Sequence, residues 1–241
     1  RDSTDSQDIR VHCKNKRYAC NITADHFDMY GFDYKINDRL TGQYHYAELE
    51  DIYRQHFLGL LANQPLAGGV LKADLRLLKS ADSGEARAGS IDNRALSTLL
   101  AYAISGHTFS AGWQRMNGDN SMPYLDGSNP YLVNYVQVND FAAAQERSWQ
   151  LRYDYDFKAI GLNGLTFLTR YVNGDHIKVL GSDQEGKEWE RDSELKYVVQ
   201  GGTFKDVSLR LRNATYRSNY AQYARDVDET RVIVSYNFSV L

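Results

Sequence analysis

Six basic side chains recur at alternating positions along the second half of the chain. They are Arg152, Arg170, Lys196, Arg210, Arg212 and Arg231. Successive side chains of a β-strand point to opposite faces, so this spacing gathers the cations on one face and apolar residues on the other. A guanidinium binds a carboxylate through two parallel hydrogen bonds, and rows of Arg or Lys along a pore select anionic groups. The pattern therefore predicts a surface that attracts carboxylates.

Acidic residues accompany these cations, and their role is open at this stage. Glu188, Glu190, Asp192 and Glu194 share one face of a strand, and Asp154 follows Arg152 at the same phase. They either form an acidic counter-wall that accommodates the ammonium group of a zwitterion, or pair with the cations and hold them in place. The basic residues alone also fit the solvated face of a soluble sheet.

The elements that position these residues show a period of two. The segment from Ser148 to Phe157 is the clearest, because every second residue is aromatic or Leu. Strands are expected at about 27–36, 40–47, 52–61, 70–78, 92–104, 108–116, 148–157, 165–172, 194–200, 207–212 and 231–240. Many approach the roughly 10 residues that a tilted strand needs to cross a bilayer, whereas strands of soluble proteins average about 5 to 6. Strand length thus favours a transmembrane β-barrel.

The connections alternate between short and long. Tight turns are expected at Asn37-Asp38, Ser105-Gly106 and Gly201-Gly202, and long polar loops at 79–91, 117–146, 173–188 and 217–228. Short periplasmic turns and long extracellular loops are typical of outer-membrane barrels. Within loop 117–146, Pro123, Tyr124 and Tyr131 would stiffen the backbone, which predicts a loop that folds inward and narrows a channel.

Composition supports an all-β chain without catalytic machinery. Among 241 residues there are 18 Tyr, 9 Phe and 18 Gly but only 3 Pro. The net charge of −3, with both signs spread along the chain, gives no footprint for nucleic acid. No stretch has the ~18 to 20 consecutive apolar residues of a membrane helix. The sequence contains no GxSxG, HExxH, glycine-rich phosphate loop or CxxC, so we expect no enzyme activity, no cofactor and no metal.

The N-terminal region differs from the rest. Cys13 and Cys20 flank a basic run, and they form either a disulfide or two free thiols. A metal site there lacks further ligands at suitable spacing. We expect residues 1–25 to form a polar loop or partial strand, and residues 26–241 to form the transmembrane strands of one domain.

Several long segments resemble the OprD-type substrate-specific porins of Gram-negative outer membranes. They are AELEDIYRQHFLGL (47–60), GSIDNRA (89–95), YLVNYVQVNDF (131–141), ERSWQLRYDYDF (146–157), GLTFLTRYVNGD (164–175), GKEWERDSELKYVVQ (186–200), LRLRNATYRSN (209–219) and DVDETRVIVSY (226–236). The resemblance implies a barrel of roughly 18 antiparallel strands, a monomer or loose homotrimer in contact with outer-membrane lipid. It also implies a constriction made by inward-folded loops and passive diffusion of small carboxylates along a basic ladder, on which Lys196, Arg210, Arg212 and Arg231 fall at ladder positions. Aromatic or cyclic carboxylates are the favoured substrates, and basic amino acids are the other branch.

The strand count departs from that family pattern. About 11 to 12 strands are expected in this chain, fewer than the family barrel contains. Either residues 8–14 supply a further strand or N-terminal strands are missing, and we favour the C-terminal part of one barrel. Two other classes stay open from the sequence: an outer-membrane barrel enzyme of the protease or lipase type, and a soluble carbohydrate-binding β-sandwich.

Overall fold

The computed structural model describes residues 9–10, 22–220 and 226–236. Two short strands, β1 (Ile9–Arg10) and β2 (Thr23–Ala24), pair with each other. The long strands are β3 (Phe27–Asn37), β4 (Leu40–Leu49), β5 (Tyr53–Leu66), β6 (Gly69–Asp82), β7 (Asp92–Ile104), β8 (His107–Asn117), β9 (Arg147–Asp156), β10 (Leu165–Lys178), β11 (Glu185–Val198), β12 (Ser208–Ser218) and β13 (Asp226–Ser235). A 3₁₀ turn, η1 (Phe157–Ile160), follows β9.

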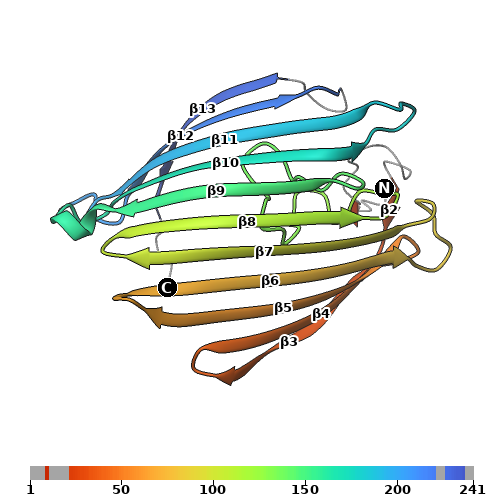
Figure 1. The fold of residues 1–241 in the computed structure, drawn as a ribbon, viewed down its shortest axis with the longest axis horizontal. Helices are drawn as coiled ribbons and strands as arrows, with labels where there is room; N and C mark the ends of the chain where they lie inside the picture. Colours follow the sequence, from red (N-terminus) through yellow and green to blue (C-terminus); the bar gives the residue numbers. More distant parts are fainter. Residues whose placement is uncertain (1–8, 11–21, 221–225, 237–241) are drawn as a thin grey trace, which may run out of the picture.

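The strands β3 to β13 form one curved antiparallel sheet in which each strand pairs with its neighbours in the chain (Figure 1). This order follows from the short connections, because consecutive antiparallel strands joined by a turn pair with each other. The described sheet is not closed, since β3 and β13 form its two edges. The all-β antiparallel fold predicted from the alternation is thereby confirmed.

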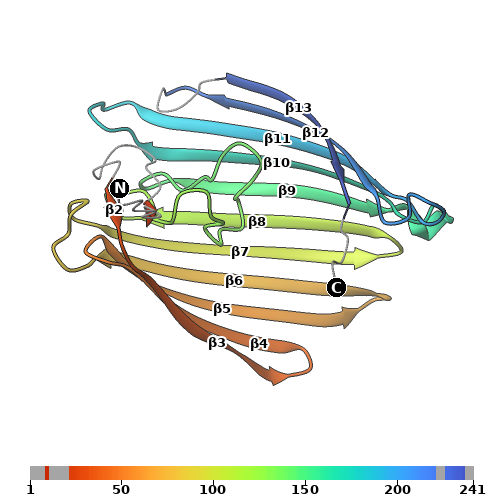
Figure 2. The ribbon, with the colours of Figure 1, turned by 180° about the vertical axis from the view of Figure 1, so that it is seen from behind.

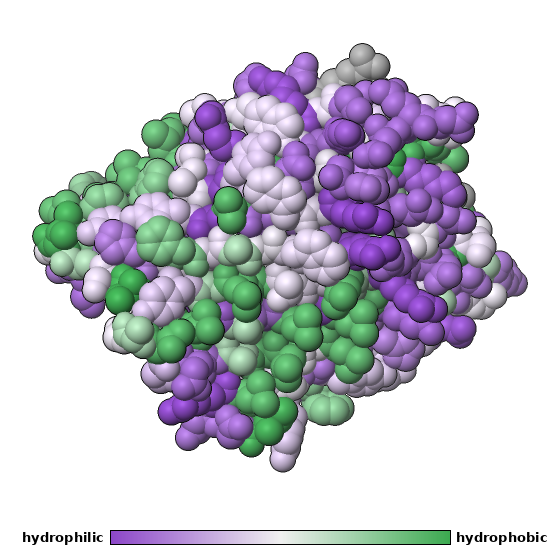
Figure 3. Space-filling view, in the orientation of Figure 1, coloured by the Kyte–Doolittle hydropathy of each residue, from purple (hydrophilic) through white to green (hydrophobic). Residues whose placement is uncertain are grey.

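The two faces of the sheet differ in what covers them. The loop of residues 118–146 crosses one face, here called the inner face, and is seen in front of the sheet in Figure 2. On the opposite, outer face, large apolar side chains are exposed over most strands: Leu58, Leu60, Leu75, Leu77, Leu100, Phe109, Trp113, Trp149, Leu151, Leu195, Tyr197, Leu209, Leu211, Val232 and Val234. Figure 3 shows this outer face, with apolar residues across its middle and polar residues at the loop end.

The distribution of polarity is the reverse of that in a soluble sheet. Leu151 on the outer face is 59% exposed, whereas its neighbour Gln150 on the inner face is 3% exposed. A contiguous exposed apolar surface of this size costs free energy in water but not in lipid. The outer face therefore suits the hydrocarbon region of a membrane. Among the described residues, no helix has the length and apolarity needed to span a bilayer.

Two predicted connections were wrong. Residues 173–188 were expected to be a loop, but β10 continues to Lys178 and β11 begins at Glu185. Polar residues extend these strands because backbone pairing continues beyond the exposed apolar residues of the outer face, here called the apolar belt. Gly174, for example, still pairs with Glu188. Gly201-Gly202 does not form a tight turn between strands. It lies within residues 199–207, which are closed by hydrogen bonds between Val199 and Val207 (2.9 Å) and between Asp206 and Val199 (2.9 Å).

Two expectations concern the N-terminal region. Of residues 8–14, the structure describes only Ile9 and Arg10, which pair with β2 and do not join the large sheet. Cys13 and Cys20 lie outside the described residues, so their bonding stays a prediction.

Candidate functional site

The register of the sheet brings the six predicted cations together. Residues that pair directly in adjacent antiparallel strands point to the same face, so the pairing defines rows across the inner face. In the first row Arg152 pairs with Arg170, and Arg170 pairs with Asp192. The next two rows pair Glu194 with Arg212, Arg212 with Arg231, and Lys196 with Arg210. We call the six cations the basic ladder.

The first row of the ladder is neutralised by bidentate or buried ion pairs. The Arg152 guanidinium donates from Nε and Nη2 to the two carboxylate oxygens of Asp154, at 2.7 and 2.6 Å. The Arg170 guanidinium donates to Asp192 at 2.8 Å, and the two side chains are only 18% and 5% exposed. Charge-assisted pairs of this geometry fix both partners, so Arg152 and Arg170 form a rigid part of the wall.

The following rows carry more positive than negative charge. Arg212 and Arg210 share one carboxylate, because Arg212 Nε donates to Glu194 and Arg210 Nε lies 3.5 Å from its other oxygen. Lys196 makes no ion pair with any residue that the structure describes, and its register partner is Arg210. Three cations therefore face one carboxylate here, so this part of the inner face carries a net positive charge that attracts a further anion.

The predicted acids lie on the same wall as the cations. Asp154, Asp192 and Glu194 bind ladder arginines, as described above, and Arg231 pairs with Glu229, a residue that the sequence analysis did not select. Glu190, by contrast, binds the loop. The geometry is thus that of an ion-paired wall. Glu229 lies two residues before Arg231 and therefore on the same face of β13, so alternation was the signal that could have found it.

Two buried glutamates of β11 anchor the loop of residues 118–146. The carboxylate of Glu190 accepts hydrogen bonds from the backbone N–H groups of Val138 and Asn139, both at 2.8 Å. Glu188 accepts from Asn139 Nδ2 at 2.6 Å and from the hydroxyl of Tyr216 at 2.7 Å. Both glutamates are 1% exposed, so each bond replaces water that the carboxylates have lost.

Buried amides fix the middle of the same loop to β8 and β9. Gln114 Nε2 donates to the carbonyl of Phe141 at 2.7 Å, and Gln150 Nε2 donates to the carbonyl of Val133 at 2.6 Å. Asn134 Nδ2 donates to Ser148 Oγ at 2.8 Å. These residues were not among the predicted site residues, although Gln114, Ser148 and Gln150 alternate with the outward tryptophans of their strands. That alternation was the available signal.

The residues expected to narrow the channel all lie in the loop on the inner face. Gln55 Nε2 donates to the carbonyl of Pro123 at 3.2 Å, and the Tyr124 hydroxyl donates to Asp140 at 2.8 Å. Arg76, which the sequence analysis did not select, donates to the carbonyl of Tyr131 at 2.9 Å. The loop is therefore tied to β5 and β6 as well as to β8, β9 and β11.

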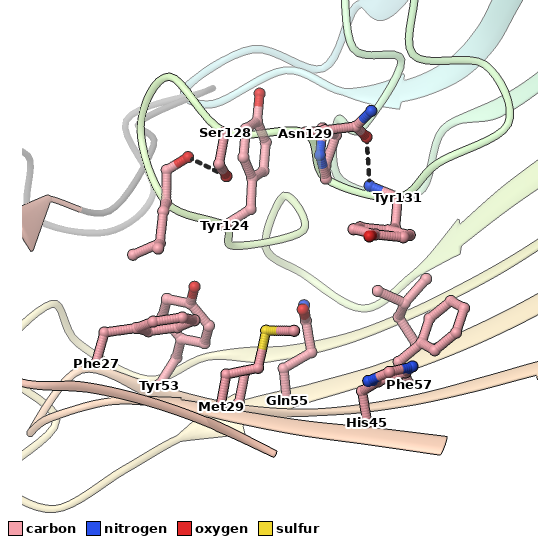
Figure 4. A pocket seen from close by; sticks show the side chains of 14 residues that line it. Phe27, Met29, His45, Tyr53, Gln55, Phe57, Tyr124, Ser128, Asn129 and Tyr131 are labelled. Carbon is pink, nitrogen blue, oxygen red and sulfur yellow. Dashed lines mark hydrogen bonds between the residues drawn. The ribbon is translucent and has the colours of Figure 1, made fainter. Parts of the chain in front are cut away.

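A pocket of about 290 Å³ remains between this loop and the strands β3 to β6. Figure 4 shows Phe27, Met29 and Phe57 on the strand side, with Tyr131 above Phe57. The rings of Phe57 and Tyr131 meet edge to face, with centroids 5.8 Å apart. The loop thus covers the apolar part of the inner face at one end, while the basic ladder stands beyond it on β9 to β13.

Comparison with known proteins fits this arrangement. The model of a family described as outer membrane porins, the OprD family, matches residues 1–240. This chain belongs to the OprD family. Members of the family are transport channels of the Gram-negative outer membrane and not enzymes, so the barrel-enzyme and soluble-sandwich alternatives are wrong.

Individual relatives give the same result. Porin D of Pseudomonas aeruginosa is 39% identical, with 91% of this chain and 54% of that protein covered. The porin-like protein GalP of Pseudomonas putida is 38% identical, with 91% and 52% covered. The crystal structure of Pseudomonas aeruginosa OccK10 (OpdN) is 64% identical, with a TM-score of 0.93 and 98% and 66% covered. The chain spans about half the length of the curated relatives that it matches.

Proposed function

We propose that the basic ladder guides small carboxylates through the channel by passive, selective diffusion. The observation that carries this proposal is the charge imbalance on β11 and β12, where Lys196, Arg210 and Arg212 face the single carboxylate of Glu194. An anion that enters finds cations whose attraction is only partly satisfied. In the arginine pairs of the first row, by contrast, each guanidinium already has its own carboxylate.

The spacing of the ladder suits stepwise movement. Cations two residues apart on one strand are separated by about 7 Å along it, and paired residues on neighbouring strands lie about 5 Å apart. A carboxylate can therefore contact the next cation before it leaves the previous one. In water, two unit charges 4 Å apart attract by only about 1 kcal/mol, so each site binds weakly and releases quickly.

The pairing of the acids favours carboxylates without an ammonium group, such as aromatic or cyclic acids, over basic amino acids. Asp154, Asp192 and Glu194 are engaged by ladder arginines, and Glu190 is engaged by the loop. An ammonium group of a zwitterion would have to compete with an arginine for one of these carboxylates. We further propose a monomer or a loose homotrimer, which light scattering in detergent would distinguish.

Single-channel recording in planar bilayers tests the proposal. Replacing Arg210 and Arg212 by glutamate should abolish block by benzoate, because the local charge changes from positive to negative. A matched control replaces Lys158 and Lys205, exposed cations at the turn end of the sheet, by glutamate. Heat-modifiable migration on gels verifies that both variants fold. Equal benzoate block in the ladder variant and the unmodified chain would refute the proposal.

A further inference from the structure

Five exposed cations form a row on the outer face, away from the basic ladder. Consecutive strands β5 to β9 each contribute one of them at the end where the long loops lie: Arg54, Lys79, Arg94, Arg115 and Arg147. Lys79 pairs in register with Arg94, and Arg115 pairs with Arg147, so these side chains are direct neighbours. We call this row the basic rim.

The basic rim borders the apolar belt. On the same face, each of three rim cations has an apolar neighbour two residues nearer to the turns. Leu77 precedes Lys79, Trp113 precedes Arg115, and Trp149 follows Arg147. Tryptophan is enriched where a membrane protein passes from hydrocarbon to headgroups. Figure 3 shows the same transition, from the apolar middle of the outer face to its polar end. The rim therefore lies at headgroup level on the side of the long loops, which is the extracellular side in this class of barrel.

The rim stays positively charged because its five cations outnumber the carboxylates that pair with them in register, Glu48 and Asp175. Within the described part of the chain, none of the five cations forms an ion pair. Glu48 lies opposite Arg54, and it accepts hydrogen bonds from Ser83 and Tyr46. Asp175 lies opposite Arg147, and it contacts the imidazole of His176 at 2.5 Å.

Two hollows open beside these cations. One, of about 400 Å³, is lined by Tyr46, Arg54, His56, Lys79 and Ala81. The other, of about 650 Å³, includes Arg115, Arg147 and Lys178 among its lining residues, together with Asp183 and Glu185 of the β10–β11 hairpin. Lys178 is paired with Asp119 at 2.8 Å. Each hollow thus presents at least two cations with room for a headgroup between them.

We propose that the basic rim binds the phosphorylated headgroups of lipids in the outer leaflet. Arg and Lys are the side chains that proteins use for phosphate, and Arg binds it through two hydrogen bonds. The adjoining apolar belt would contact the acyl chains of the same molecule, which a free phosphate ion does not have. The rim is separate from the ladder, so this site is independent of which solute the channel carries.

Tryptophan fluorescence of the full chain in nonionic detergent micelles provides the test. Brominated phosphatidic acid should quench Trp113 and Trp149 at much lower concentration than brominated phosphatidylcholine does, because these side chains adjoin Arg115 and Arg147. Replacing Arg94, Arg115 and Arg147 together by glutamine should raise the half-quenching concentration of phosphatidic acid about a hundredfold, since each cation near an anionic surface contributes about 1 kcal/mol.

Matched variants separate the charge of the rim from general effects. Replacing Arg39, Lys158 and Lys205, cations at the turn end, by glutamine makes the same change in net charge and should leave quenching unchanged. Replacing the three rim arginines by lysine should retain it. Equal losses in rim and control variants would overturn the proposal, as would quenching that does not distinguish the two lipids. Displacement of the lipid by inorganic phosphate would assign the rim to a free anion instead.

Discussion

Replacing Glu190 by glutamine removes one of two acceptors that hold the loop of residues 118–146 against β11. In the unmodified chain, Oε1 accepts from Val138 N–H and Oε2 from Asn139 N–H, each at 2.8 Å. Glutamine keeps one oxygen and turns an NH₂ donor toward the other N–H. Because Glu190 is 1% exposed, water cannot replace the lost acceptor, and the loss should cost about 1.5 to 3 kcal/mol.

Amide hydrogen exchange measures this cost directly. A loss of that size should increase the opening of the loop, and hence the exchange rates of the Val138 and Asn139 amides, about 10- to 100-fold. Met122, whose N–H donates to the carbonyl of Ala142 at 3.0 Å elsewhere in the loop, should change less. Glu229→Gln is the matched control, because Glu229 accepts a hydrogen bond from the Gln137 side chain of this loop, whereas the backbone N–H groups of Val138 and Asn139 donate to Glu190. Unchanged protection of Val138 and Asn139 in E190Q would refute the anchoring role.

Substitutions at three further sites test the ion-paired wall, the packing of the loop of residues 118–146 against β10, and the lipid-facing surface. Arg170→Met leaves the buried carboxylate of Asp192 without its guanidinium partner. The free energy of unfolding, measured by urea denaturation, should fall by about 3 kcal/mol. Adding Asp192→Asn to the same chain should restore part of the lost stability. Gly174→Ala places a Cβ 2.2 Å from Glu146 Oε1 and 3.1 Å from Phe141, so it should cost about 1 to 3 kcal/mol by the same assay. Leu211→Arg on the outer face should cost about 2 to 4 kcal/mol in a bilayer, whereas Leu211→Phe should be tolerated; equal stabilities would contradict the lipid-facing assignment.

Much of the fold could be predicted from alternation because the two faces of the sheet have opposite environments. The phase of Arg152, Arg210 and Arg212 against Leu151, Leu209 and Leu211 decides which side each residue faces, and one cross-strand register satisfies all of them. A shift by one residue would turn every cation toward lipid. The inner-face placement of the ladder therefore follows from local sequence.

The pairing partners could not be predicted in the same way. That Glu194 serves both Arg210 and Arg212, whereas Lys196 has no ion-pair partner among the described residues, depends on side-chain geometry between neighbouring strands. The hydrogen bonds of Glu190 to the loop join residues 51 and 52 positions apart, and no periodicity encodes them. The end of β10 and the start of β11 were predicted wrongly within 173–188. The change from apolar to polar residues shows where the membrane-facing surface ends, whereas backbone pairing continues beyond it.

Block of single channels by benzoate in the Lys196→Gln variant distinguishes a ladder that attracts carboxylates from one that does not. Lys196 lies in the part of the ladder where cations outnumber carboxylates, and removing its charge should weaken the attraction for a carboxylate by about 1 kcal/mol in a water-filled channel. The benzoate concentration for half-block should then rise about fivefold. Lys205→Gln, which makes the same change in charge in the connection between β11 and β12, should leave it unchanged. Identical block in the Lys196→Gln variant and the unmodified channel would show that the ladder does not attract benzoate.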